Sequence, residues 1–193
     1  MGKDTLKVMG ASNHTDEERS KLDYYGTDPR STKALLEVET FDHNIWEPCA
    51  GHHLITNVLY DAGYHVLSSD IADYEHFINL KLNFLEYEGE WDGDIITNPP
   101  YGLSTEFAVK ALELVKPGHK VAMFLRTLFL EGTKRYEKLF KENPPRYVYV
   151  FTNRQVSDKN DDFSKGSAVS YSWFVWIKGY KGPTEIKWIS SKK

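Results

Sequence analysis

The hexapeptide TNPPYG at residues 97–102 places a polar amide, two prolines and an aromatic ring in one short stretch. Two successive prolines cannot continue a helix or pair inside a sheet, so the stretch is expected to form a turn that ends a strand. The prolines also stiffen the backbone, which holds the amide of Asn98 at a fixed spacing from the ring of Tyr101. A turn requires neither side chain, so their use depends on what the rest of the chain places beside them.

Two more polar segments follow predicted strands. The loop PCAGHH at 48–53 comes directly after the strand that ends with Glu47, and Asp70 ends the next strand. Ligands of open α/β sheets bind beyond the carboxyl ends of the strands, where the strand order reverses. The small residues up to Gly51 let a ligand approach the backbone, and the carboxylate of Asp70 can accept hydrogen bonds from both hydroxyls of a ribose. Because the chain contains neither G-x-G-x-x-G nor G-x-x-x-x-G-K-[ST], the predicted ligand is an adenosine-like nucleoside that needs no phosphate cradle.

The elements that must position these segments alternate along the chain. Strands are predicted at 44–47, 65–70, 94–97, 120–125, 147–151, 170–177 and 184–189, and helices within 27–39, over 54–62, from 104 to about 116, and over 132–142. The stretch 71–91 has no clear period. This order predicts an α/β fold with a mostly parallel central sheet, helices on both faces, and C-terminal strands that are free to pair antiparallel.

Composition limits the kind of protein. With 193 residues, 40% of them hydrophobic, the chain is long enough for one domain at 23–193, preceded by a polar extension at 1–22. It has no apolar run of membrane-spanning length and no signal-peptide pattern, so we expect a cytoplasmic protein without a membrane partner. The single cysteine excludes an internal disulfide, and a net charge of −4 means that any contact with nucleic acid must be local.

The set EPCAG at 47–51, SSD at 68–70, NFL at 83–85 and TNPPYG at 97–102 resembles the S-adenosylmethionine-dependent amino-methyltransferases, above all the DNA adenine-N6 group. The resemblance covers about residues 24–190, and it extends to small methyltransferase-type proteins of phages and mobile elements. It implies a Rossmann-like methyltransferase fold, S-adenosyl-L-methionine as cofactor, and a location in a bacterial or phage-infected host cell.

The resemblance also assigns roles to residues. Cofactor contacts are implied for Thr27, Pro29, Glu47, Cys49, Ala50, Gly51, Asp70, Asn83, Phe84 and Asn98, and catalytic roles for Asn98, Pro99, Pro100 and Tyr101. Asn83 stands where the family has Asp, and His53 stands where it usually has a second glycine. A Cβ and an imidazole at position 53 would either crowd the cofactor or turn outward.

The chemistry of such a reaction explains an Asn-Pro-Pro-Tyr. The lone pair of an amine on a purine is delocalised into the ring, which makes the amine a poor nucleophile. Two acceptors, the side-chain oxygen of Asn98 and the carbonyl of Pro99, would take the two N–H bonds and direct the lone pair at the methyl group, while Tyr101 stacks on the ring. No strong general base is needed before transfer.

A base inside a duplex cannot reach such a pocket, so the DNA would be flipped out or single-stranded. Candidates for contact with the base or its backbone are Tyr101, Phe129 after the strand at 120–125, and Arg154, Lys159 and Lys165 in the long polar loop at 154–170. Adjacent histidines point apart, so His52 and His53 do not predict a metal site.

Alternative functions remain compatible with the sequence. One is a catalytically silent, S-adenosylmethionine-binding or decoy protein, suggested by His53, Asn83 and the lack of a separate target-recognition domain. Another is methylation of a different planar amine or amide, namely cytosine N4, RNA adenine or a protein glutamine. A third is an enzyme that needs a partner chain or a homodimer to recognise its target.

Overall fold

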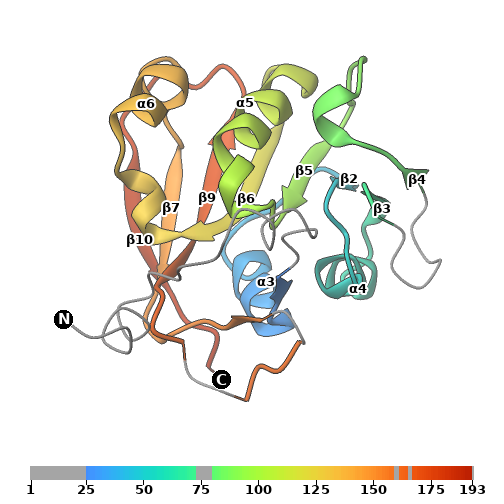
Figure 1. Cartoon of the computed structure of the whole chain (residues 1–193), viewed down its shortest axis with the longest axis vertical. Helices are drawn as coiled ribbons and strands as arrows, with labels where there is room; N and C mark the ends of the chain where they lie inside the picture. Colours follow the sequence, from blue (N-terminus) through green and yellow to red (C-terminus); the bar gives the residue numbers. More distant parts are fainter. Residues whose placement is uncertain (1–24, 73–79, 159–160, 165–166, 193) are drawn as a thin grey trace, which may run out of the picture.

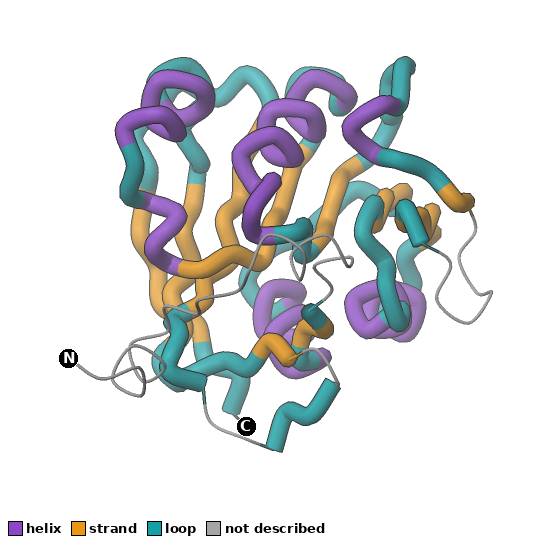
Figure 2. Tube along the Cα trace, viewed as in Figure 1, coloured by secondary structure: helices purple, strands orange, loops and turns teal. Residues whose placement is uncertain are grey.

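The computed structural model describes residues 25–72, 80–158, 161–164 and 167–192. Its strands are β1 (Gly26–Thr27), β2 (Asn44–Glu47), β3 (His65–Asp70), β4 (Leu80–Lys81), β5 (Asp94–Thr97), β6 (Lys120–Arg126), β7 (Tyr147–Phe151), β8 (Ser157–Asp158), β9 (Tyr171–Ile177) and β10 (Glu185–Ile189). Eight of them form the central sheet in the order β10-β7-β9-β6-β5-β2-β3-β4 (Figure 1). The pair β1 and β8 forms a small antiparallel ribbon next to the helix that begins at Pro29 (Figure 2).

Helices cover both faces of the sheet. They are α3 (Pro29–Leu36), α4 (Leu54–Asp61), α5 (Ser104–Leu114) and the short α6 (Thr133–Arg135), and 3-10 turns lie at Phe84–Glu86, Tyr101–Leu103 and Thr127–Leu130. Side chains of β6 alternate between two apolar clusters, because successive residues of a strand point to opposite faces. Ala122 and Phe124 pack with the α3 and α4 side, whereas Met123 and Leu125 pack with the α5 side.

The strand order reverses at β2. This strand pairs in parallel with β3 on one side and with β5 on the other, although β3 directly follows it in the chain and β5 does not. A crevice therefore opens between the carboxyl ends of β2 and β5, which is where ligands of such sheets bind. The loop at 48–53 and the prolines after Thr97 border this crevice.

Most predicted elements are confirmed, with two differences. β9 pairs antiparallel with both β6 and β7, but β10 is parallel to β7, so only one of the C-terminal strands is antiparallel. The helix predicted at 132–142 is present but shorter and mixed in type, because three α-helical residues lead into a π-helical turn at Tyr136–Phe140. In that turn the Lys141 amide donates to the Tyr136 carbonyl at 2.9 Å, one residue beyond α-helical spacing.

The large aromatic residues of β9 belong to the core. Trp173, Phe174 and Trp176 are almost completely buried, and the two indole N–H groups donate to the carbonyls of Ser31 and Asn143. Because both indole N–H groups have acceptors, the burial of these rings stabilises the sheet between the two helical layers. These side chains are therefore not available as a stacking platform for a ligand.

Candidate active site

Two neighbouring cavities lie at the carboxyl ends of the central strands. The first, here the switch-point cavity, has a volume of about 190 Å³ and is lined by Tyr25, Pro48, Cys49, Asp70, Ile71, Leu82, Asn83, Phe84, Leu85, Asn98, Pro100, Leu103 and Phe107. The second, here the β6 cavity, has a volume of about 240 Å³ and is lined by Tyr101, Ser104, Leu125, Arg126, Leu128, Phe129, Glu131 and Arg135. The NPPY turn and the 3-10 turn after it contribute side chains to both.

Asn98 has a fixed orientation at the wall of the switch-point cavity. Its Nδ2 donates to the backbone carbonyl of Tyr25 at 2.8 Å, and a carbonyl can only accept, so the amide nitrogen must be the atom on that side. The other end of the amide, Oδ1, is buried and has no hydrogen-bond partner within the described residues. Within the described residues, no backbone amide donates a hydrogen bond to the carbonyl of Pro99. Asn98 Oδ1 is therefore an acceptor without a partner at the cavity wall, and the Pro99 carbonyl has no backbone donor within the described residues.

The ring of Tyr101 is enclosed by other groups. Its hydroxyl lies 2.9 Å from the Ser157 hydroxyl, and the ring centroids of Tyr25 and Tyr171 lie 5.5 and 5.9 Å away. The guanidinium carbon of Arg126 lies 4.8 Å from the centroid of the Tyr101 ring. Burial raises the pKa of the Tyr101 hydroxyl well above its ordinary value, so the group stays protonated. Tyr101 lines the β6 cavity, and it cannot act as a base near neutral pH.

Asp70 joins the end of β3 to the loop after β2. Its carboxylate accepts from the backbone amides of Gly51 at 3.0 Å and Ala72 at 3.1 Å, and the side chain is mostly buried at the cavity wall. Burial raises the pKa of this carboxyl from its ordinary value, against the opposing effect of the Ala72, Gly51 and Ile71 amides and of His53. A carboxylate offers about four acceptor positions, so it can still accept from a ligand hydroxyl.

Three more residues that were predicted as cofactor contacts line this cavity, namely Cys49, Asn83 and Phe84. Phe84 is buried between Trp46 and Phe107, with ring centroids 5.2 and 5.1 Å away. Asn83 caps the turn before it, because its Oδ1 accepts from the Leu85 amide at 3.2 Å. Burial raises the pKa of the Cys49 thiol well above its ordinary value, which keeps this cysteine a neutral packing group rather than a nucleophile.

Several predicted residues do not line the switch-point cavity. Thr27 lies on β1, and Pro29 begins α3 behind the Asp28 cap, whose side chain accepts from the Arg30 amide. Ala50 and Gly51 border the cavity through backbone contacts with β3 rather than as lining side chains. Pro99 is buried within the turn.

Glu47 also points away from the cavity. It is fully buried at the end of β2 and accepts a hydrogen bond from the Thr56 hydroxyl on α4. Burial raises the pKa of this carboxyl well above its ordinary value, more than the Thr56 hydroxyl lowers it. The folded state therefore favours the protonated form, and its stability falls as pH rises from the ordinary glutamate pKa toward the raised one.

We accordingly expect Glu47→Gln to stabilise the protein at pH 7 by on the order of 1 kcal/mol, because the amide matches the neutral acid without a buried charge. The advantage should disappear at pH 4, where the wild-type side chain is protonated in both states. Urea unfolding at both pH values measures it, with Glu37→Gln on the exposed end of α3 as control. Equal stability of Glu47→Gln and wild type at pH 7 would contradict this assignment.

His53 occupies a backbone conformation that suits glycine. It precedes α4 with φ 62° and ψ 23°, in the left-handed region that costs an ordinary residue about 1–2 kcal/mol. The side chain is not among those lining the switch-point cavity, although its Nε2 is buried and its charge lowers the pKa of the nearby Asp70 carboxyl. The departure from the family pattern at this position therefore changes backbone strain and leaves the cavity open.

His53→Gly is expected to stabilise the protein by about 1 kcal/mol, which raises Tm by roughly 2–4 °C in a chain of this length. The same change at the neighbouring His52, which lacks a positive φ and lies 2.7 Å from a carboxylate oxygen of Asp161, should lower Tm instead. Differential scanning calorimetry compares the two variants. A fall in Tm for both would show that the backbone strain at His53 is negligible.

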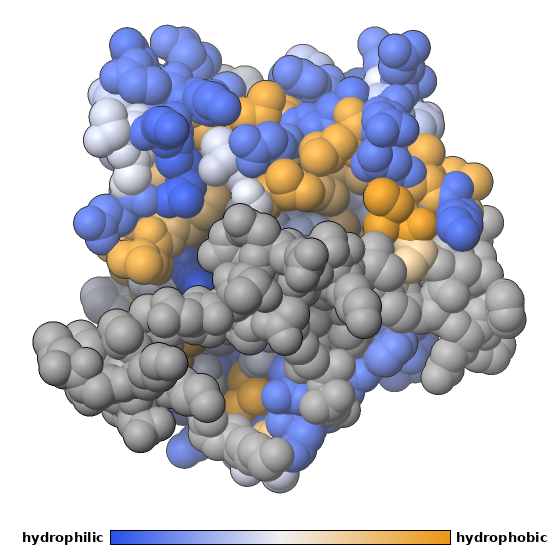
Figure 3. Space-filling model, in the orientation of Figure 1, coloured by the Kyte–Doolittle hydropathy of each residue, from blue (hydrophilic) through white to orange (hydrophobic). Residues whose placement is uncertain are grey.

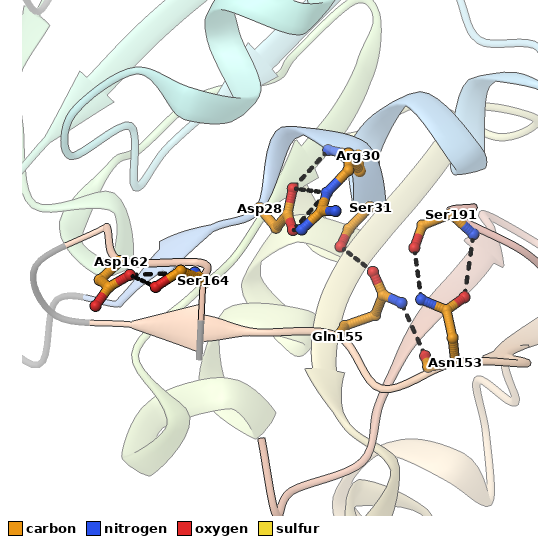
Figure 4. A network of polar contacts seen from close by, with 8 residues as sticks. All are labelled: Asp28, Arg30, Ser31, Asn153, Gln155, Asp162, Ser164 and Ser191. Carbon is orange, nitrogen blue, oxygen red and sulfur yellow. Dashed lines mark hydrogen bonds and ion pairs between the residues drawn. The ribbon is translucent and has the colours of Figure 1, made fainter. Parts of the chain in front are cut away.

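The segment after β7 is held against the N-terminal part of the domain. Gln155 is buried and accepts from the Ser31 hydroxyl at 2.8 Å, while Asn153 bonds to Ser191 near the C-terminus (Figure 4). Further along, β8 pairs with β1, and Asp161 contacts His52. This part of the predicted 154–170 loop is thus structured around β1 and the loop after β2.

The candidates for substrate contact have different outcomes. Phe129 lines the β6 cavity but is mostly buried, with the Arg135 guanidinium carbon 4.1 Å from its ring centroid. Arg154 is exposed and lines neither of the two cavities. Lys159 and Lys165 lie outside the described residues, as does the predicted extension at 1–22.

Among the lining residues that were not predicted, two bear directly on the chemistry of the site. Tyr25 lines the switch-point cavity and fixes Asn98 through a contact between residues 73 positions apart, which no local pattern indicates. Arg126 lines the β6 cavity as the last residue of an otherwise buried strand. A charged residue at the carboxyl end of a buried strand is the same signal that identified Asp70, and it could have identified Arg126 as well.

Comparisons with known proteins define the fold. No protein-family model and no curated protein matches the chain. A candidate class I S-adenosylmethionine-dependent methyltransferase from Listeria monocytogenes has a TM-score of 0.56 and 12% identity, over 96% of this chain and 70% of its own length. The 1,6-didemethyltoxoflavin-N1-methyltransferase of Burkholderia thailandensis, solved with S-adenosylhomocysteine, has a TM-score of 0.53 and 10% identity, over 91% of this chain and 85% of its own.

The M protein of the type I restriction enzyme EcoKI is also similar, with a TM-score of 0.55 and 16% identity over 83% of this chain. This chain spans only 45% of that protein. The fold is thus the Rossmann-like fold of class I S-adenosylmethionine-dependent methyltransferases, and the fold prediction is confirmed.

No helix in the described ranges is long and apolar enough to cross a membrane, and these ranges contain no cluster of three His, Cys, Asp or Glu side chains suited to a metal ion.

Proposed function

We propose that this protein transfers a methyl group from S-adenosylmethionine to the exocyclic N6 of adenine, in DNA that is flipped out or single-stranded. The observation that carries the proposal is the buried, unpartnered Oδ1 of Asn98 at the wall of the switch-point cavity. A buried acceptor without a partner costs about 1–3 kcal/mol, and the N–H of a substrate amine would relieve that cost.

The lining of the switch-point cavity fits the cofactor. Asp70 would accept from the ribose hydroxyls, Phe84 would pack against the adenine ring, and Asn83 lies at the adenine edge by resemblance to the family. Bound S-adenosylmethionine would supply a methyl group that is electrophilic because it is attached to a sulfonium.

The protein's own part in the reaction is orientation. Asn98 Oδ1 and the Pro99 carbonyl would accept hydrogen bonds from the two N–H groups of the amine. This arrangement would direct the lone pair of the nitrogen toward the methyl group. Bound S-adenosylmethionine would supply the methyl group to the nitrogen held in this orientation, and water would take the proton that the methylated nitrogen releases. The raised pKa of the Tyr101 hydroxyl agrees with a site that contains no strong base.

A single labelling experiment tests the proposal. The protein is incubated with tritiated S-adenosylmethionine and a mixture of DNA, RNA and protein, and the label is expected in DNA as N6-methyladenine. Label in RNA or protein only would redirect the proposal to another planar amine or amide. Label in no polymer, with S-adenosylhomocysteine bound in calorimetry, would favour the catalytically silent binding protein.

A further inference from the structure

The β6 cavity has the walls of a site for a flat ring. The aromatic rings of Tyr101 and Phe129 and the side chains of Leu125 and Leu128 form its apolar part. Leu128 is 70% exposed, and Figure 3 shows apolar surface where the segment after β6 reaches the outside. Aromatic and aliphatic side chains with a few polar groups at one cavity suit a planar heterocycle better than a flexible polar chain.

Most polar groups of this cavity are already occupied. The Ser104 hydroxyl donates to the carbonyls of Pro100 and Tyr101. The Arg135 guanidinium donates to the Phe129 and Glu131 carbonyls, and its Nε donates to the Thr105 hydroxyl at 3.3 Å. Ser104 thus holds the NPPY turn and Arg135 holds the turn after β6, so both are structural members of the wall.

Arg126 is the exception. Its Nε is buried and has no hydrogen-bond partner in the described part of the chain, while its guanidinium lies against the ring of Tyr101. An unpaired buried donor on a charged group is costly, so an acceptor that enters the cavity would be bound in preference to an apolar group of the same shape. The Glu131 side chain at the same cavity disfavours an anionic group and favours a neutral acceptor.

We propose that Arg126 is a specificity-determining residue whose Nε–H donates to a ring nitrogen of the base that receives the methyl group. The inference rests on the proposed function, because it places the target base beside Tyr101. Adenine carries three neutral ring acceptors, N1, N3 and N7, and a planar donor on a stacked guanidinium suits any of them. Asn98 would then hold the amine while Arg126 recognises the ring.

The test combines variants of Arg126 with modified substrates. Methyl transfer is measured on oligonucleotides whose target adenine is replaced by 1-deaza-, 3-deaza- or 7-deaza-adenine, which exchange one ring nitrogen for C–H. For wild type, one of the three replacements is expected to reduce kcat/KM at least about 10-fold, as for the loss of one charged hydrogen bond. For Arg126→Lys and Arg126→Met, the same replacement should reduce kcat/KM by less than about threefold.

Controls separate recognition from folding and charge. Lys134→Gln removes one positive charge from an exposed position near the cavity and should retain the wild-type pattern. Binding of S-adenosylhomocysteine and the Tm show whether each variant is folded, and Arg126→Lys, which keeps the cation against Tyr101, serves if Arg126→Met does not fold.

The outcomes distinguish this inference from the proposed function. If wild type methylates DNA but each deaza replacement has the same effect in wild type and in the Arg126 variants, the role of Arg126 is refuted and the proposed function stands. If wild type methylates no DNA, the proposed function fails and the inference fails with it.

Discussion

Asn98→Ala is expected to reduce methyl transfer by about 10²–10³-fold while leaving the affinity for S-adenosylhomocysteine within about threefold of wild type. The variant removes the Oδ1 acceptor that orients the amine, an interaction that strengthens as the nitrogen develops positive charge. The backbone of the turn should persist, because the Asn98 side chain is not needed for its conformation. The prolines restrict the backbone, and the Leu103 amide donates a hydrogen bond to the Pro100 carbonyl. Single-turnover kinetics and calorimetry measure the two quantities.

Two further variants sharpen this test. Asn98→Asp retains an acceptor at Oδ1 but places its second oxygen against the Tyr25 carbonyl, where the amide nitrogen now donates. We expect its rate to fall between those of wild type and Asn98→Ala. Asn57→Ala, on the exposed face of α4, removes an unrelated amide and should have the wild-type rate. A loss of cofactor affinity as large as the loss of rate in Asn98→Ala would mean that Asn98 binds the cofactor rather than orients the amine.

The sequence predicted the site well where chemistry coincided with the ends of buried strands. The strand at 94–97 was predicted with its observed bounds, because an apolar run ending in two prolines has few other conformations. Parallel strands bring their carboxyl ends to one edge of the sheet, so Cys49, Asp70 and Asn98 were predicted together and line one cavity.

The rest of the site depends on contacts that local patterns do not encode. Glu47 has the residue type and position of a ligand-binding carboxylate, yet it packs against Thr56 of α4. The left-handed conformation of His53 was not predicted from the histidine itself, although the glycine that the family usually has at this position is the residue that favours a positive φ. The π-helical turn at 136–140 buries Leu139 in the core, and the hydrophobic period of the segment does not distinguish such a turn from an α-helix.

Asp70→Ala should have the opposite effect to Asn98→Ala, in that it weakens cofactor binding and preserves turnover. The carboxylate accepts from the Gly51 amide and, in the proposed complex, from the ribose hydroxyls. Loss of hydrogen bonds to a charged group costs about 1.5–3 kcal/mol, so Kd for S-adenosylhomocysteine should rise roughly 10–100-fold. At saturating S-adenosylmethionine, kcat should stay within about threefold of wild type, because Asp70 does not contact the amine.

The pH dependence of cofactor binding provides an independent check on Asp70. Since burial raises the pKa of its carboxyl, protonation on acidification should begin at a higher pH than for an ordinary aspartate. Affinity for S-adenosylhomocysteine should then fall in wild type as pH decreases through that pKa, whereas Asp70→Asn should bind more weakly and without this dependence. Asp61→Asn, at the exposed end of α4, should follow wild type. The same pH profile in wild type and Asp70→Asn would show that another group controls cofactor affinity, and the ribose contact would then have to be assigned elsewhere along the carboxyl edge of the sheet.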